Sequence, residues 1–252
     1  MAAKQRGDRK LKGSIGDITY SRRKNGTWSA YEKVESNAKK IASHPDFLLI
    51  RQNNTEFGRA GAAGKLFRDA IRSKMKMTTD SGASPRLLKT LLRIIKEDPV
   101  SDRGERKLSN GPIEMLEGFD FNETAPLSIV LPAPFTTTID RVTGSLKLDI
   151  PGFIPARLMK TPPGATHFKI IATALELDFD SGQFVADAKY SSDLPCNNDS
   201  TADIVLVTTV TPGSTKPLFQ LMALEFSQLI NGKYYQMATK NVNALKVVKV
   251  AS

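Results

Sequence analysis

The sequence predicts an α+β protein, in which a basic region with a hairpin and two helices precedes an antiparallel β-sandwich. Helical spacing of apolar residues is confined to the first hundred or so residues, whereas short apolar runs divided by turn residues fill the remainder. The charge changes as well. Residues 1–117 contain 25 Lys and Arg against 14 Asp and Glu, and residues 118–252 contain 11 against 12. We therefore predict two domains, 1–117 and 118–252.

Residues 13–34 are predicted to form a β-hairpin around the turn signal Asn25-Gly26, because both central positions of a type I′ turn need a positive φ. The hairpin mixes cations with aromatic rings. Its candidate polyanion-binding residues are Arg22, Arg23, Lys24 and Trp28. Such residues can hold phosphates while bases stack on the rings. The alternative, which we favour, is that the aromatic rings pack on the protein's own domain.

Two helices are predicted from the spacing of apolar residues, at about 45–77 and 85–98. Ser84 fits the N-cap of the second helix and Pro85 its first helical position, with Asp98 before a proline at its end. We interpret the pair as an αα-hairpin that packs on the rest of the protein.

Three glycines, Gly58, Gly61 and Gly64, lie inside the first predicted helix. Each costs on the order of 1 kcal/mol relative to alanine in a helix interior. They indicate either a break between two helices or a smooth face that lets another backbone approach. We prefer the smooth face, because the intervening alanines maintain helix propensity.

The C-terminal part has the regular alternation of short strands and turns that is typical of an immunoglobulin-like sandwich. Turns are predicted at 142–144, 180–182 and 231–232. The predicted strands lie near 127–131, 145–150, 167–178, 184–188, 204–210, 218–230, 234–238 and 244–250.

The residue inventory argues against an enzyme and against a bound metal or cofactor. His44 and His167 are the only histidines, each is expected to be structural, and Cys196 has no base near it in sequence. A single cysteine excludes an internal disulfide. The acidic residues at 176–180 could bind calcium, but a hairpin turn uses Asp in any case. We therefore predict no catalytic residues, no metal site and no cofactor.

The polar N-terminus shows no secretory signal, and no apolar stretch is long enough to cross a membrane. We expect a cytoplasmic protein, or one in a particle that assembles in the cytoplasm.

Several segments resemble a large family of uncharacterised proteins from Bacteroidota. These segments are KLKGSIGDITY (10–20), EFGRAGAAGK (56–65), GATHF (164–168) and PLF (217–219). The resemblance covers most of the chain and implies a bacterial, non-secreted protein. It carries no activity, cofactor or binding residue across.

Two functions follow as hypotheses. The first is a non-enzymatic structural or assembly protein that contacts other subunits, as a homo-oligomer or in a phage-like or other multi-subunit assembly. The second is a nucleic-acid-binding protein that uses the basic hairpin and helices. The positive charge of the N-terminal half fits either one, because it can meet a polyanion, pair with an acidic neighbouring subunit or serve only as a solvated surface.

Overall fold

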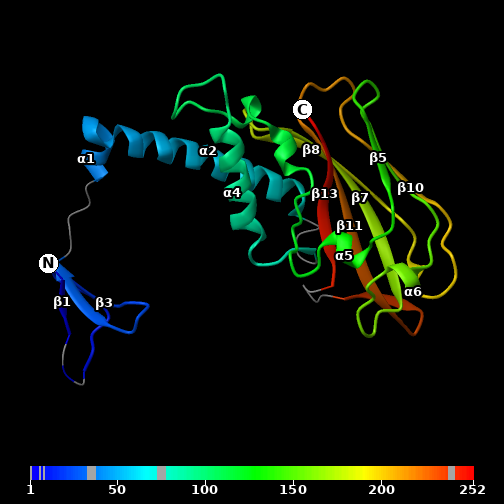
Figure 1. Ribbon diagram of the computed structural model, residues 1–252, viewed down its shortest axis with the longest axis horizontal. Coiled ribbons are helices and arrows are strands. Elements are labelled where there is room, and N and C mark those ends of the chain that lie inside the picture. The colour runs from blue at the N-terminus through cyan, green and yellow to red at the C-terminus, as the bar shows by residue number, and fades with distance from the viewer. Residues whose placement is uncertain (1, 6, 8, 33–37, 73–77, 238–241) are drawn as a thin grey trace. The chain divides into compact units, whose positions relative to one another are not determined.

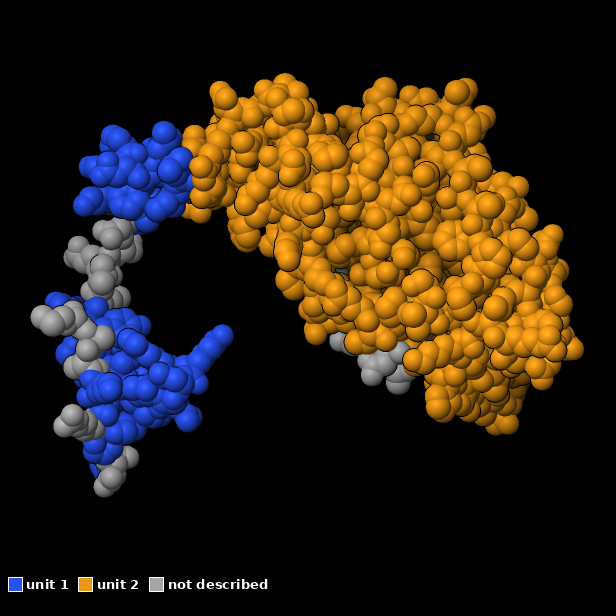
Figure 2. Space-filling model, in the orientation of Figure 1, with its two compact units in different colours: residues 1–51 blue, residues 52–252 orange. Residues whose placement is uncertain are grey.

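The computed structural model describes residues 2–5, 7, 9–32, 38–72, 78–237 and 242–252. The chain divides into two compact units, unit 1 (Met1–Arg51) and unit 2 (Gln52–Ser252), which are coloured separately in Figure 2. Helices and antiparallel sheets are both present, so the predicted α+β class is confirmed.

Unit 1 contains a small antiparallel sheet with the strand order β1-β4-β3-β2. Its strands are β1 (Ala2–Lys4), β2 (Gly13–Ile15), β3 (Ile18–Arg22) and β4 (Trp28–Glu32). The predicted hairpin is present, but its turn type was wrong. Gly26 alone has a positive φ, and Arg23 N donates to Thr27 O at 2.8 Å across a three-residue loop. The chain therefore forms a type I turn followed by a left-handed glycine. Gly26 alone takes the positive φ, so Asn25 does not have to adopt one.

Four helical segments follow the small sheet: α1 (Ala38–Ser43), η1 (Pro45–Phe47), α2 (Leu48–Ala70) and α4 (Ala83–Lys96). The predicted helix at 45–77 corresponds to α2, although residues 73–77 lie outside the described ones. The second helix begins two residues earlier than predicted. Its N-cap is Gly82 in place of Ser84, because the Asp80 carboxylate accepts the Gly82 N–H at 2.6 Å and fixes the first turn.

Helix α2 runs without a break through Gly58, Gly61 and Gly64, so the predicted alternative of two separate helices is wrong. A Cβ at Gly64 would lie 3.4 Å from the Leu91 side chain of α4, an ordinary contact distance, whereas one at Gly58 or Gly61 would meet open space. The close approach of another backbone, which we had preferred, is therefore not found at these glycines among the described residues.

Two antiparallel sheets form the C-terminal part of unit 2 (Figure 1). The three-stranded sheet has the order β10-β6-β5, with β5 (Thr136–Asp140), β6 (Ser145–Ile150) and β10 (Ile204–Thr209). The larger sheet has the order β12-β11-β7-β8, with β13 also paired to β11 and β9 to β7. Its strands are β7 (His167–Asp178), β8 (Gln183–Tyr190), β9 (Leu194–Pro195), β11 (Leu218–Ile230), β12 (Lys233–Gln236) and β13 (Ala244–Ala251).

The three predicted turns are confirmed, and Asn231-Gly232 has the positive φ at both positions that a type I′ turn requires. The predicted strand at 127–131 was wrong, because α5 (Leu127–Val130) occupies it. Leu127, Val130 and Leu131 are buried at the i, i+3, i+4 spacing of a helix. The remaining short helices are η2 (Leu108–Asn110), η3 (Ile113–Leu116) and α6 (Pro155–Leu158).

The central strands β7 and β11 of the larger sheet are buried on both faces. One face packs on the three-stranded sheet, through residues such as Phe168 and Phe226. The other face packs on α2 and α4, with Leu175, Phe219 and Leu221 in the same core as the helices (Figure 1). The helices and the sandwich therefore share one core. The division falls between residues 51 and 52, and not at the predicted 117/118, because the change in charge does not coincide with a change in packing.

Asp98 ends α4 and organises the loop after it. Its carboxylate accepts backbone N–H groups from Val100, Ser101 and Lys107 at 2.8 to 3.1 Å, and its side chain is buried. Burial raises the pKa of Asp98, but these hydrogen bonds outweigh it and hold the pKa well below its ordinary value.

We expect Asp98→Asn to lower the free energy of unfolding by about 2 kcal/mol near neutral pH, because an amide replaces an acceptor of several N–H groups. The folded-state pKa lies below the unfolded one, so this contribution is complete above about pH 4 and is lost as the pH falls through the folded pKa. Urea unfolding should therefore show a difference between the proteins that shrinks in acid. Asp102→Asn in the same loop is the control, and a difference that grows in acid would contradict the assignment.

Candidate functional site

The structure brings two of the four predicted polyanion-binding residues together. Arg22 and Trp28 are directly opposite on β3 and β4, and the Arg22 guanidinium carbon lies 5.8 Å from the centroid of the Trp28 ring. Arg23 and Lys24 follow in the turn, and all three cations are exposed. Within the described residues none of the three has an ion-pair partner. The hairpin therefore presents one cation–π pair and two further cations.

The surroundings of Trp28 bear on the two interpretations of the hairpin. By register, Ile15, Ile18, Tyr20 and Ala30 share the face of the sheet that carries Arg22 and Trp28. Among the residues of unit 1 whose burial is described, no hydrophobic side chain is buried, and Ser29 is the only buried residue. The aromatic rings of the hairpin therefore do not form a core within unit 1.

A second candidate site lies in unit 2, where a cavity of about 600 Å³ opens beside α4. Arg86, Lys89, Thr90 and Arg93 line one wall from α4. The other walls come from Met115, Gly118, Phe119, Asp120, Glu123 and Pro126. Nothing in the sequence placed the segment 115–126 opposite the basic residues of α4.

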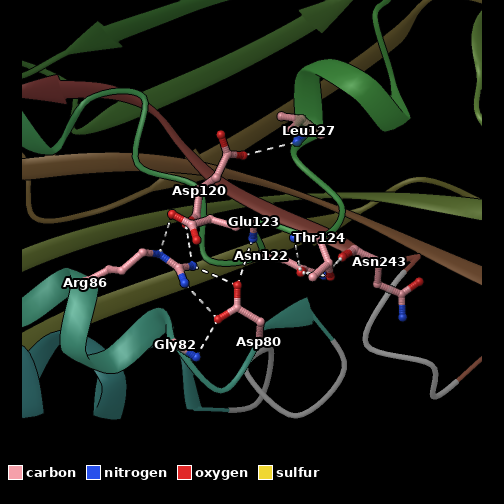
Figure 3. Close-up of polar contacts among 9 residues, drawn as sticks. All are labelled: Asp80, Gly82, Arg86, Asp120, Asn122, Glu123, Thr124, Leu127 and Asn243. Atoms are coloured by element: carbon pink, nitrogen blue, oxygen red, sulfur yellow. Dashed lines mark hydrogen bonds and ion pairs between the residues drawn. The ribbon is translucent and has the colours of Figure 1, made fainter.

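Arg86 connects this cavity to a network of polar contacts (Figure 3). It donates two hydrogen bonds of 2.9 Å to the two oxygens of the Asp80 carboxylate, and its Nε lies 3.1 Å from Glu123. Asp80 also accepts the backbone N–H of Glu123 at 2.8 Å. Burial raises the pKa of Asp80, but the bonds from Arg86 and the backbone outweigh it and lower the pKa below its ordinary value. The carboxylate is thus held ionised at neutral pH.

Asp120 and two asparagines fix the opposite side of the network. Asp120 lies 3.3 Å from Lys246 of β13 and accepts the Leu127 N–H that begins α5. Asn122 donates to Asn243 O at 2.8 Å, and Asn243 in turn accepts the Phe226 N–H at 2.9 Å. The segment 120–127 is therefore held between α4 and the larger sheet (Figure 3).

His167, Cys196 and Asp178 do not line the cavity beside α4. His167 packs edge-on against Tyr234 at 5.0 Å, and burial raises the pKa of the Cys196 thiol. Asp178 accepts N–H groups within its own turn and pairs with Lys216 at 2.8 Å. In the part of the chain that the structure describes, no group of three or more His, Cys, Asp or Glu residues is arranged to hold a metal ion.

Comparisons with protein-family models, curated proteins and solved structures found no match. The resemblance to the Bacteroidota family therefore stays a prediction from the sequence. Over the described residues, none of the helices combines the length and the apolar character needed to cross a membrane.

We expect Asp80→Ala to destabilise the protein by about 3 kcal/mol, because it removes one partner of a largely buried ion pair and leaves Arg86 uncompensated. Urea denaturation measures the loss. The matched control is Asp69→Ala, whose partner Arg72 is mostly exposed and whose removal should change stability little. Equal stability of the Asp80 variant and the wild type would show that the network does not support the fold.

Proposed function

We propose that the chain is a non-enzymatic subunit of a larger protein assembly, in which unit 1 packs on another subunit. The observation that carries the proposal is that the described residues of unit 1 bury no hydrophobic side chain. Small sheets with few strands are marginal in water unless one face packs against another element. The exposed side chains of Ile15, Ile18 and Tyr31 leave that requirement unmet.

The start of α2, like the small sheet, exposes large apolar side chains. Leu48, Leu49 and Ile50 are consecutive and exposed, with exposed fractions of 51%, 56% and 43%. Three large apolar residues in a row are unusual on a helix that faces only solvent. They extend the apolar surface of unit 1 that a second subunit would cover.

The strand order of the sandwich supports the finer proposal of an immunoglobulin-like domain. If β5, β6, β7, β8, β10, β11 and β13 are lettered A, B, C, C′, E, F and G, the sheets become A-B-E and C′-C-F-G. In immunoglobulin-like domains, strands A, B and E likewise share one sheet, and C, F and G the other. Such domains serve many functions, so this likeness indicates an architecture and not an activity.

An assembly protein is consistent with the residue inventory. Neither histidine is paired with the cysteine or a carboxylate in a buried cleft, so we infer no catalytic role and no bound cofactor for the described residues. A place in the cytoplasm, or in a particle assembled there, is part of the same proposal, as is membership of the Bacteroidota family.

Light scattering on the full chain tests the assembly. We expect a mass that is a multiple of 27.6 kDa and that persists at high salt, since apolar contacts are not screened. Leu49→Glu should reduce the mass, because it places a charge in the apolar surface. Val142→Glu is the matched control, because Val142 is an exposed apolar residue in a turn of unit 2. A monomeric wild type at all concentrations would refute the proposal.

Nucleic-acid binding is a second candidate, and the Arg22–Trp28 pair is the observation that favours it. A ring stacked under a guanidinium, with Arg23 and Lys24 beside it, offers a base platform next to phosphate contacts. Unit 1 as a whole contains 12 Lys and Arg against 5 Asp and Glu.

If this candidate holds, a single-stranded oligonucleotide should bind with an affinity that falls steeply with salt. Reversing the charges of Arg22, Arg23 and Lys24 to Glu should abolish binding, as fluorescence anisotropy would show. A triple reversal at Arg157, Lys160 and Lys233 gives the same net charge on exposed positions of unit 2. An equal loss of affinity in both triple variants would mean that net charge alone drives binding. It would contradict the hairpin as the binding site.

A further inference from the structure

The cavity beside α4 is lined by both acidic and basic side chains, and the proposed assembly function does not require this arrangement. Each carboxylate of the wall lies close to a cation of the protein. Glu123 lies 3.1 Å from Arg86, which also pairs with Asp80, and Asp120 lies 3.3 Å from Lys246 while it accepts the Leu127 N–H. The wall and its ion-pair partners together hold four cations (Arg86, Lys89, Arg93 and Lys246) against three carboxylates (Asp80, Asp120 and Glu123).

Two cations of the same wall, Lys89 and Arg93, have no such partner among the described residues. Lys89 and Arg93 lie four residues apart on α4, so their side chains project from the same face of the helix. Both are exposed, and across the described ranges neither has a hydrogen-bond or ion-pair partner from a side chain. The cavity thus ends in two unpaired positive charges, and its wall with its ion-pair partners holds an excess of one positive charge, which attracts one anionic group.

The rest of the cavity is apolar. Met115 and Phe119 are partly buried, and both pack on the core that α4 shares with the larger sheet. Phe119 is held edge-on by Phe121, with ring centroids 4.9 Å apart. Pro126 closes the wall at the start of α5. A ligand in this position would meet rigid apolar surface at one end and cations at the other.

The size and rigidity of the cavity suit a small molecule. Its volume of about 600 Å³ lies within the range of roughly 300 to 1,000 Å³ that is usual for ligand sites. The Asp80–Arg86 pair fixes the first turn of α4, and Asn122 and Asn243 fix the facing segment. The walls are therefore positioned before any ligand arrives, so little ordering would be needed on binding.

We propose that this cavity binds a small organic anion with an apolar or aromatic body, whose charged group contacts Lys89 and Arg93 and whose body lies against Met115 and Phe119. The site is independent of the proposed packing of unit 1, because all of its residues belong to unit 2. Its excess of one positive charge favours an anion over an organic cation.

A pair of fluorescent dyes tests the proposal on the full-length protein. The dye 8-anilinonaphthalene-1-sulfonate has an anionic group on an aromatic body, and N-phenyl-1-naphthylamine has the same rings without the charge. We expect the anionic dye to bind at least about tenfold more tightly, because hydrogen bonds to a charged group stabilise a complex more than apolar contact alone. Equal affinity of the two dyes would overturn the anionic site.

The variant Lys89→Gln/Arg93→Gln locates the binding. It should weaken binding of the anionic dye by about tenfold or more and leave binding of the neutral dye unchanged. Lys96→Gln is the matched control, because Lys96 is exposed on the same helix but does not line the cavity. Circular dichroism melting confirms that each variant is folded. A double variant that binds the anionic dye as tightly as the wild type overturns the site, whether or not the chain assembles through unit 1.

Discussion

The pairing of β7 with β11 is the interaction on which unit 2 depends. The two strands are antiparallel from Leu218–Glu176 to Ser227–His167, and most of their residues are buried. A sheet with two buried faces needs a layer on each side, because either face left open would expose large apolar residues to water. The three-stranded sheet covers one face, and α2 and α4 cover the other. The helices are therefore a structural layer of the sandwich and not a separate domain.

The small sheet of unit 1 differs from the larger sheet, because no layer covers it among the described residues of unit 1. Its strands are three to five residues long, and they bury no described hydrophobic side chain. The same chain thus contains one sheet with a large hydrophobic core and another whose described residues have none. A small sheet without a core is stabilised chiefly by what it contacts, which makes unit 1 the natural place to look for a partner.

The sequence was informative where local signals decide the structure and misleading where distant contacts do. The hairpin, both helices and most strands were predicted, because periodicity and turn residues are local. The run at 127–131 was predicted as a strand but forms α5, whose first N–H, that of Leu127, donates to the distant Asp120. The domain boundary failed for a related reason. Continuous apolar runs such as 167–178 show burial on both faces, but they do not show which segment covers each face.

The two candidate sites also differ in how far the sequence predicts them, because one is local in the chain and the other joins distant segments. The sequence identified the cations and the ring of the hairpin, but the predicted two-residue turn would have placed Arg23 opposite Trp28, whereas the three-residue loop places Arg22 there. The Arg86 network joins residues 80, 86, 120 and 123, and no spacing links them; the only readable signal was that Arg86, Lys89 and Arg93 share a helix face.

The excess positive charge of residues 1–117 therefore comes from two separate regions, unit 1 and residues 52–117, and does not form one binding surface. Unit 1 has 12 cations against 5 acids, whereas residues 52–117 have 13 against 9, with Arg59, Arg72 and Arg86 in ion pairs. A polyanion would meet its strongest field at unit 1, while the cations of α4 serve the fold and its cavity.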